Sequence, residues 1–192
     1  MSITQNKVVV AGGGLMGTGI AHAFASSGFV TVLVDSNEAA AAKALSAVAK
    51  ILDDGVRLGK LDAAVADAAK SRLTTQADLA AASAGAALLV ETVTENIAVK
   101  KQVVATAAAH MLPDAIIATN TSALSVTEIA TAVPQPERVV GMHFFNPVHK
   151  MKLVELVRGI ATSDETVART REYSDALGKT SIIVNESPGL TT

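Results

Sequence analysis

The chain has 192 residues, a net charge of −2, an aromatic content of only 3% and no cysteine. The lack of cysteine excludes disulfides, thiol nucleophiles and cysteine-based zinc sites, and the scattered charge provides no basic arm or stripe for nucleic acid or an anionic membrane. The longest apolar run, residues 79–90, is well short of the roughly 20 residues that a membrane span needs, and residues 1–7 lack the apolar segment of a signal peptide. We therefore expect a soluble cytoplasmic protein with no metal site.

Apolar runs of strand length alternate with segments of helical period, which is typical of βαβ units around a parallel sheet. We predict strands at 7–11, 31–34, 86–90, 115–119, 139–143, 153–157 and 181–184, and helices at 15–27, 37–54, 61–72, 97–110 and 164–177. Ser36 is the expected N-cap of the second helix, and Gly28 and Gly178 should end the first and last helices. Two helices fall between the second and third predicted strands. The fold class is therefore α/β, with a doubly wound, mostly parallel sheet and a helical pair inserted after the second strand.

A glycine-rich turn separates the first strand from the first helix. Its G-x-G-x-x-G pattern suits a dinucleotide-binding turn of the Rossmann type, because the first glycine permits the tight turn, the second admits the pyrophosphate and the third lets the helix approach the strand. The helix N-terminus then offers free N–H groups to the phosphates. The predicted cofactor-binding residues of this turn are Gly12, Gly14, Leu15, Met16 and Gly17.

Asp35 ends the second predicted strand, near the spacing expected for the acid that binds the adenosine ribose. The alternative for Asp35 is a cap at the strand end. Between Ser36 and Ala42 there is no Lys or Arg that could pair with a 2′-phosphate. The sequence therefore predicts NAD rather than NADP as the cofactor.

Polar residues follow the later strands, where a doubly wound sheet binds its ligands. Glu91 and Glu95 follow one strand, Asn120 and Ser122 the next, and His143 ends the one after that. The alternatives are that the two glutamates are solvated loop acids and that Asn120 and Ser122 cap a helix at 125–130.

Glu155 lies inside an apolar strand, so its carboxylate needs a partner. We predict that it pairs with His143, because a carboxylate that orients an imidazole produces a general base. The alternative places Glu155 on the wet face of an edge strand. The remaining histidines are expected to be structural (His22 and His110) or solvent-facing (His149).

Five segments together resemble the short-chain L-3-hydroxyacyl-CoA dehydrogenases, including bacterial 3-hydroxybutyryl-CoA dehydrogenases. They are GGGLMGTGIA at 12–21, ETVTENIAVKK at 91–101, NTS at 120–122, HFFNP at 143–147 and KLVEL at 152–156. The resemblance implies NAD-dependent interconversion of a 3-hydroxyacyl-CoA and a 3-oxoacyl-CoA.

The resemblance also implies roles for individual residues. His143 would take the hydroxyl proton and Glu155 would hold it in place, while Ser122 would bind the reacting oxygen and Asn120 would position nicotinamide and substrate. Glu95 and Lys100 would serve the nicotinamide ribose. The expected substrate-binding residues are Ser122, Asn146, Arg57 and Lys60, the last two as candidates for the CoA phosphates.

Family members continue into a helical domain that carries most dimer contacts. We expect residues 1–186 to form the NAD-binding domain and 187–192 to begin the connection to that domain, so the full-length protein would be a homodimer and this chain would bind NAD but turn over poorly. His149-Lys150 stands where relatives commonly have small apolar residues, which would alter the acyl pocket. The competing hypotheses are a related β-hydroxyacid or sugar-acid dehydrogenase and a non-catalytic NADH-binding module.

Overall fold

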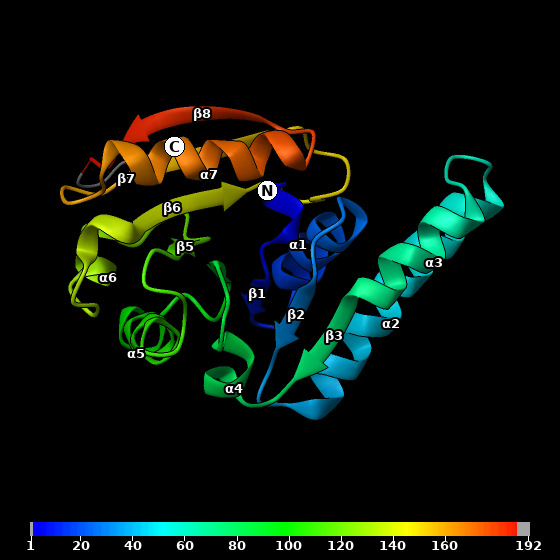
Figure 1. Ribbon diagram of the computed structural model, residues 1–192, viewed down its shortest axis with the longest axis horizontal. Helices are drawn as coiled ribbons and strands as arrows, with labels where there is room; N and C mark the ends of the chain where they lie inside the picture. Colours follow the sequence, from blue (N-terminus) through cyan, green and yellow to red (C-terminus); the bar gives the residue numbers. More distant parts are fainter. Residues whose placement is uncertain (1, 188–192) are drawn as a thin grey trace.

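The computed structural model describes residues 2–187 and contains a single eight-stranded sheet (Figure 1). The strands are β1 (Val8–Ala11), β2 (Thr31–Val34), β3 (Leu73–Gln76), β4 (Leu88–Glu91), β5 (Ile116–Thr119), β6 (Val139–Phe144), β7 (Leu153–Arg158) and β8 (Thr180–Asn185). Their order is β3-β2-β1-β4-β5-β6-β7-β8. The first six strands are parallel, β7 is antiparallel to β6, and β8 is parallel to β7. The predicted doubly wound, mostly parallel sheet is confirmed.

Helices cover both faces of the sheet (Figure 1). They are α1 (Leu15–Ser26), α2 (Glu38–Arg57), α3 (Ala63–Arg72), α4 (Leu79–Ser83), α5 (Ile97–Ala108), α6 (Val126–Ala130) and α7 (Asp164–Ala176), with short 3-10 turns at Ile3–Gln5 and Pro136–Arg138. None of the helices in residues 2–187 is both long and apolar enough to cross a membrane.

Alternation along the strands divides the interior into two cores. In β1, Val8 and Val10 face a core shared with α1, α2, α3 and α7, whereas Val9 and Ala11 face a core shared with α4, α5 and α6. This follows from the two-residue period of a strand, which sends successive side chains to opposite faces. Because both faces are covered, all four residues of β1, β2, β4 and β5 are buried.

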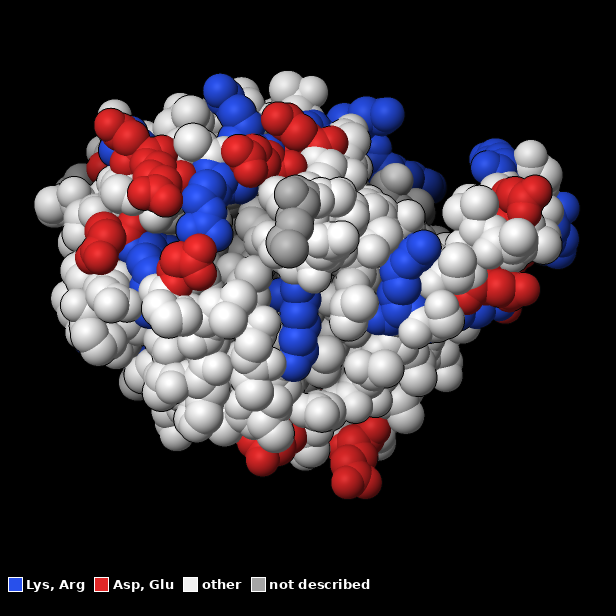
Figure 2. Space-filling view, viewed as in Figure 1, with Lys and Arg blue, Asp and Glu red and all other residues white. Residues whose placement is uncertain are grey.

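The helical pair after β2 connects to a strand that the sequence pattern did not predict. α2 and α3 extend away from the sheet (Figure 1), and they lead into β3, which pairs with β2 at the edge. Only Leu73 of β3 is buried, so the segment lacks the apolar run of an interior strand. Acidic and basic side chains lie on the projecting pair (Figure 2), where the ion pairs Lys50–Asp54 and Lys70–Asp53 connect them.

Of the three predicted cap residues of helices, two agree with the structure and one does not. Gly28 and Gly178 adopt positive φ, 102° and 68°, directly after the C-caps of α1 and α7. The cap of α2 is Asn37 rather than Ser36, because the Asn37 side chain accepts hydrogen bonds from the amides of residues 39 and 40. A side chain that satisfies these free amides defines where a helix begins.

The chain reverses its winding direction between β1 and β4. From β1 it builds outward through β2 to β3, then crosses to β4 on the opposite side of β1. Ligands of open α/β sheets bind beyond the carboxyl ends of the strands at such a switch point. The ends of β1, β4, β5 and β6 are therefore where the site should lie.

Candidate functional site

The glycine turn after β1 has the geometry that each glycine was predicted to supply. Gly12 has φ 111°, and a Cβ on Gly17 would lie 1.8 Å from the Gly12 carbonyl oxygen, so only glycine lets α1 start this close to the turn. A Cβ on Gly14 would meet no described atom within 4 Å. The space above Gly14, at the N-terminus of α1, suits a pyrophosphate. Leu15 is exposed beside it, and Met16 packs partly against the core.

Asp35 lies directly beside this turn. One of its oxygens accepts a hydrogen bond from the Gly13 amide at 2.8 Å, and the other accepts from the Asn37 amide at 2.8 Å. The carboxylate therefore connects the end of β2 to the glycine turn. The strand-end cap, the alternative reading, describes only the Asn37 bond.

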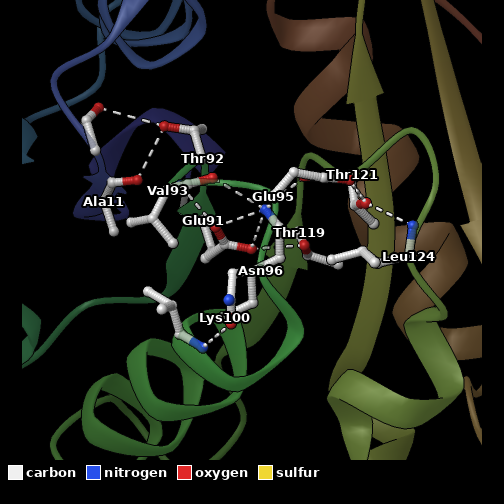
Figure 3. Close-up of polar contacts among 12 residues, drawn as sticks. Ala11, Glu91, Thr92, Val93, Glu95, Asn96, Lys100, Thr119, Thr121 and Leu124 are labelled. Carbon is white, nitrogen blue, oxygen red and sulfur yellow. Dashed lines mark hydrogen bonds and ion pairs between the residues drawn. The ribbon is translucent and has the colours of Figure 1, made fainter.

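Glu91 ends β4 and Glu95 follows it, and the two glutamates lie in different environments. Glu91 is fully buried and pairs with Lys100, with Nζ to Oε1 at 3.0 Å, so its interpretation as a solvated loop acid is wrong. Glu95 has 42% of its side chain exposed, and its carboxylate contacts Lys100 Nζ at 3.3 Å and the Thr121 hydroxyl. Glu95 therefore presents an immobilised carboxylate at the strand ends (Figure 3).

Lys100 has a different position from the one its predicted cofactor role implies. Its side chain is 0% exposed, and its ammonium faces Glu91, Glu95 and the Val93 carbonyl. A buried ammonium with these partners reaches a cofactor only through Glu95. This part of the prediction is corrected: Lys100 is buried behind Glu95 and contacts that residue instead of lining the site itself.

Asn120 and Ser122 follow β5 and do not cap α6. The cap is Ser125, whose hydroxyl accepts from the Glu128 amide. Asn120 instead accepts a hydrogen bond from the Phe144 amide at 2.8 Å, which connects the loop after β5 to the end of β6. Ser122 is exposed. The alternative reading as helix caps is therefore wrong for both residues, and the Asn120 side chain is held at the end of β6.

His143 and Glu155 form the predicted pair. The antiparallel register of β6 and β7 places them directly opposite each other, and His143 Nδ1 lies 2.9 Å from Glu155 Oε2. Glu155 is 31% exposed, but β7 is an interior strand because β8 covers its other edge, so the edge-strand alternative is wrong. The His143 ring also packs on Phe145, with ring centroids 4.7 Å apart. This arrangement uses Nδ1 for the carboxylate and leaves Nε2 for a reacting group.

The other histidines have structural surroundings. Burial, with His149 and Lys179 nearby, lowers the pKa of His22 from 6.5 to about 4. His149 is exposed, and its ring contacts His22 edge-on at a centroid distance of 6.2 Å. His110 follows α5 and contacts the Thr106 carbonyl through Nδ1.

All four predicted substrate-binding residues are exposed, including Ser122 after β5. Asn146 lies in the loop after β6, and Lys60 lies at the tip of the α2–α3 pair. Arg57 lies near the same tip and pairs with Asp54 at 3.2 Å. Residues 188–192 of the predicted interdomain connection lie outside the described part of the chain.

Three threonines in this region were not predicted. Thr92 donates its hydroxyl to the Ala11 carbonyl, Thr119 donates to Glu91, and Thr121 donates to Glu95. Single threonines at strand ends have no distinctive sequence pattern. Only their partners, which are distant in the chain, reveal their positions.

Fold and site together define a dinucleotide-binding α/β domain with a histidine–carboxylate pair at its ligand-binding edge. The family described as "3-hydroxyacyl-CoA dehydrogenase, NAD binding domain" matches residues 7–187. The chain belongs to this family.

Solved structures agree with the family assignment. A 3-hydroxybutyryl-CoA dehydrogenase from Escherichia coli K12 is 38% identical with a TM-score of 0.93, covering 97% of this chain and 39% of that one. FadB2 of Mycobacterium tuberculosis is 36% identical with a TM-score of 0.92, covering 98% of this chain and 66% of that one. An (S)-3-hydroxybutyryl-CoA dehydrogenase from Ralstonia eutropha is 38% identical with a TM-score of 0.91, covering 96% of this chain and 65% of that one. The chain thus spans 39% to 66% of the length of these proteins.

Proposed function

We propose that this chain binds NAD and contributes the catalytic base of a dehydrogenase that interconverts a 3-hydroxyacyl-CoA, such as 3-hydroxybutyryl-CoA, and the corresponding 3-oxoacyl-CoA. The observation that carries the proposal is the 2.9 Å contact between His143 and Glu155 at the edge of the sheet that also bears the glycine turn. Two of the similar proteins are described as 3-hydroxybutyryl-CoA dehydrogenases.

The proton chemistry follows from the orientation of His143. Glu155 accepts a hydrogen bond from Nδ1–H of His143. Nε2 of the neutral ring is therefore the basic nitrogen, and it takes the proton of the 3-hydroxyl group. The imidazolium that forms is stabilised by the carboxylate. A bound NAD would supply the acceptor for the hydride that leaves the carbon bearing the 3-hydroxyl group. In the reverse direction His143 returns the proton to the 3-oxo oxygen.

Neighbouring residues orient the reactants. Because the Asn120 oxygen accepts from the Phe144 amide, its NH2 group remains as a donor toward substrate or nicotinamide. Ser122 provides an exposed hydroxyl for the reacting oxygen, and Glu95 provides a carboxylate for a ribose hydroxyl. Asn146 would contact the acyl group, while Arg57 and Lys60 would reach CoA phosphates from the helical pair.

The decisive experiment measures cofactor binding and hydride transfer separately in the chain. NADH binding is followed by fluorescence titration, and oxidation of bound NADH by acetoacetyl-CoA is followed in a single turnover with protein in excess. We expect clear NADH binding and slow oxidation. Binding without any oxidation would favour the non-catalytic NADH-binding module, and absence of binding would contradict the proposal altogether.

Variants of the pair test the assigned chemistry. His143→Ala should slow the single-turnover oxidation on the order of 10³-fold, because the proton donor is lost. Glu155→Gln keeps a hydrogen-bonding group but removes the charge, so a loss of about 10²-fold is expected. Both variants should keep NADH affinity within about two-fold, since neither residue lies at the glycine turn. An unchanged rate in His143→Ala would place the proton donor elsewhere.

A further inference from the structure

A fully buried ion pair lies beneath the ends of β4 and β5 (Figure 3). Glu91 and Lys100 are both 0% exposed, and Lys100 Nζ lies 3.0 and 3.1 Å from the two Glu91 oxygens. Thr119 donates its hydroxyl to Glu91 at 2.7 Å, and the Val93 amide donates to it at 2.7 Å. Every oxygen of this carboxylate is therefore engaged, as a buried charge requires.

Stability alone does not explain why the chain keeps this pair. Removing two charges from water costs several kcal/mol per ion, and replacing a buried pair by apolar residues is often neutral or stabilising. The preceding residues of β4 and β5 are aliphatic and buried, and the polar groups around the pair, Thr119 and the Val93 backbone, bond to the charges themselves. We therefore looked for a function of the two charges in the surface residues that they contact.

Lys100 connects the buried Glu91 to the surface residue Glu95, because its ammonium contacts both carboxylates. Its ammonium has three hydrogens, which face Glu91, the Val93 carbonyl at 3.2 Å and Glu95 Oε2 at 3.3 Å. Of the three charged side chains in this set, only Glu95 is exposed to solvent. Its position is therefore set by a cation that Glu91 holds from below.

Thr121 holds the other Glu95 oxygen. The Thr121 hydroxyl donates to Glu95 Oε1 and accepts from the Leu124 amide at 2.9 Å (Figure 3). The hydroxyl therefore makes its hydrogen bonds within the protein. Glu95 thus bridges the segment after β4 and the loop after β5 that carries Asn120 and Ser122. A carboxylate fixed at both oxygens is preorganised for a ligand hydroxyl.

The strand order places this bridge on the route of the cofactor. The glycine turn follows β1, the His143–Glu155 pair lies on β6 and β7, and β4 and β5 lie between them. A dinucleotide whose pyrophosphate sits at the glycine turn and whose reactive end reaches His143 must pass over the ends of β4 and β5. Glu95 therefore faces its nicotinamide half, whereas Asp35 on the β2 side faces its adenosine half.

We propose that Glu91 is a positioning residue for the nicotinamide half of the cofactor site and acts through Lys100 on Glu95. The proposal rests on the proposed NAD-binding function. Without the Glu91 charge, the buried ammonium needs another counter-ion and draws Glu95 inward, away from Thr121. Without both charges, Glu95 loses its cation and turns toward solvent. In either case the ribose-facing carboxylate leaves its place while the glycine turn stays intact.

The test compares NADH with ADP, which lacks the nicotinamide half, in the wild-type chain, in Glu91→Gln and in the double variant Glu91→Gln/Lys100→Met. Glu91→Gln strands a buried cation and should lower both the melting temperature and NADH affinity. The double variant leaves no unpaired buried charge, because Glu95 is partly exposed to solvent, so its melting temperature should return toward that of the wild type. Its NADH affinity should remain about ten-fold weaker, with ADP affinity within about two-fold.

Glu186→Gln is the matched control. It also changes a carboxylate to an amide, but Glu186 is only partly buried and accepts from the Thr127 amide in α6, away from the β4–β5 ends. We expect unchanged NADH and ADP affinities in this variant. If the double variant does not fold, Thr119→Val replaces it, because this change removes one hydrogen bond to Glu91 and keeps both charges. We expect it to weaken NADH binding about three-fold and to leave ADP binding unchanged.

The possible results separate this proposal from the proposed function. Recovery of both melting temperature and NADH affinity in the double variant would show that the pair is only structural. Equal losses for NADH and ADP would also overturn the positioning role. If the wild-type chain bound no NADH, the proposed function would fail and this proposal with it.

Discussion

At the scale of single residues, Asp35 has a fixed position that supports the proposed preference for NAD over NADP. Its two oxygens accept hydrogen bonds from the Gly13 and Asn37 amides, so the carboxylate stays at the turn before any ligand arrives. A 2′-phosphate brought to this position would meet a fixed negative charge, and no Lys or Arg lies between Ser36 and Ala42 to offset it. Repulsion between like charges at contact distance is on the order of 1 kcal/mol or more.

The first prediction concerns cofactor choice. Asp35→Asn keeps an oxygen that accepts a hydrogen bond but removes the charge, so we expect the preference for NADH over NADPH to fall about ten-fold. Fluorescence titrations with both nucleotides measure this ratio. Glu38→Gln, which neutralises an acid in the first turn of α2 nearby, is the control for a general change in surface charge. An unchanged ratio in Asp35→Asn would mean that other groups exclude the 2′-phosphate.

At the scale of elements, the junction of β1 and α1 depends on two glycines for different reasons. Gly17 lies where the helix passes the turn, and a Cβ there would overlap the Gly12 carbonyl at 1.8 Å. Gly14 has an ordinary φ of −74° and open space around its missing side chain. Gly17 therefore allows close packing of α1 on the turn, and Gly14 leaves room for a ligand.

These two positions form a matched pair of variants. Gly17→Ala should lower the free energy of unfolding by about 1–3 kcal/mol, because α1 must move away from the turn. Gly14→Ala should leave stability almost unchanged but weaken NADH binding by at least about ten-fold, because a methyl group would occupy the space meant for the pyrophosphate. Chemical denaturation and NADH titration distinguish the two effects. Full NADH affinity in Gly14→Ala would contradict the placement of the pyrophosphate.

At the scale of the whole molecule, the loop after β6 is packed onto α1 around His22. Lys179 donates to the Val148 and Met151 carbonyls, and a Cβ on Gly19 would touch Val148. His22 lies beneath this loop, and within the described residues its buried Nδ1 has no hydrogen-bond partner. Burial, with His149 and Lys179 nearby, keeps the His22 pKa at about 4 in the folded chain.

The low His22 pKa predicts acid sensitivity of the fold. Between pH 6.5 and about 4 the unfolded chain binds a proton at His22 that the folded chain does not, so stability falls as pH falls through this window. The full effect is on the order of 3 kcal/mol. His22→Gln should show a smaller loss of unfolding free energy between pH 7 and pH 4 than the wild type, whereas exposed His110→Gln should behave like the wild type. Parallel pH profiles for wild type and His22→Gln would contradict the assignment.

Much of the fold could be predicted because its signals are local. Buried strands such as β1 and β5 are short apolar runs, and the glycine turn has a fixed spacing, so both follow from neighbouring residues. The edge strand β3 was missed because three of its four residues are not buried. Asn37 displaced Ser36 as a cap because either residue satisfies the capping preference and only backbone geometry distinguishes them.

In the site, too, features with local sequence signals were predicted and features that depend on distant contacts were not. The sequence was sufficient to predict the glycine turn, the acid after β2 and the pairing of His143 with Glu155, since each depends on residue type and on strand ends that the pattern reveals. The tertiary structure alone showed that Lys100 is buried, that Glu91 holds it, and that Thr121 fixes Glu95. These contacts join residues on separate strands and loops, and only the order and register of β4, β5 and the segments after them determine which side chains meet.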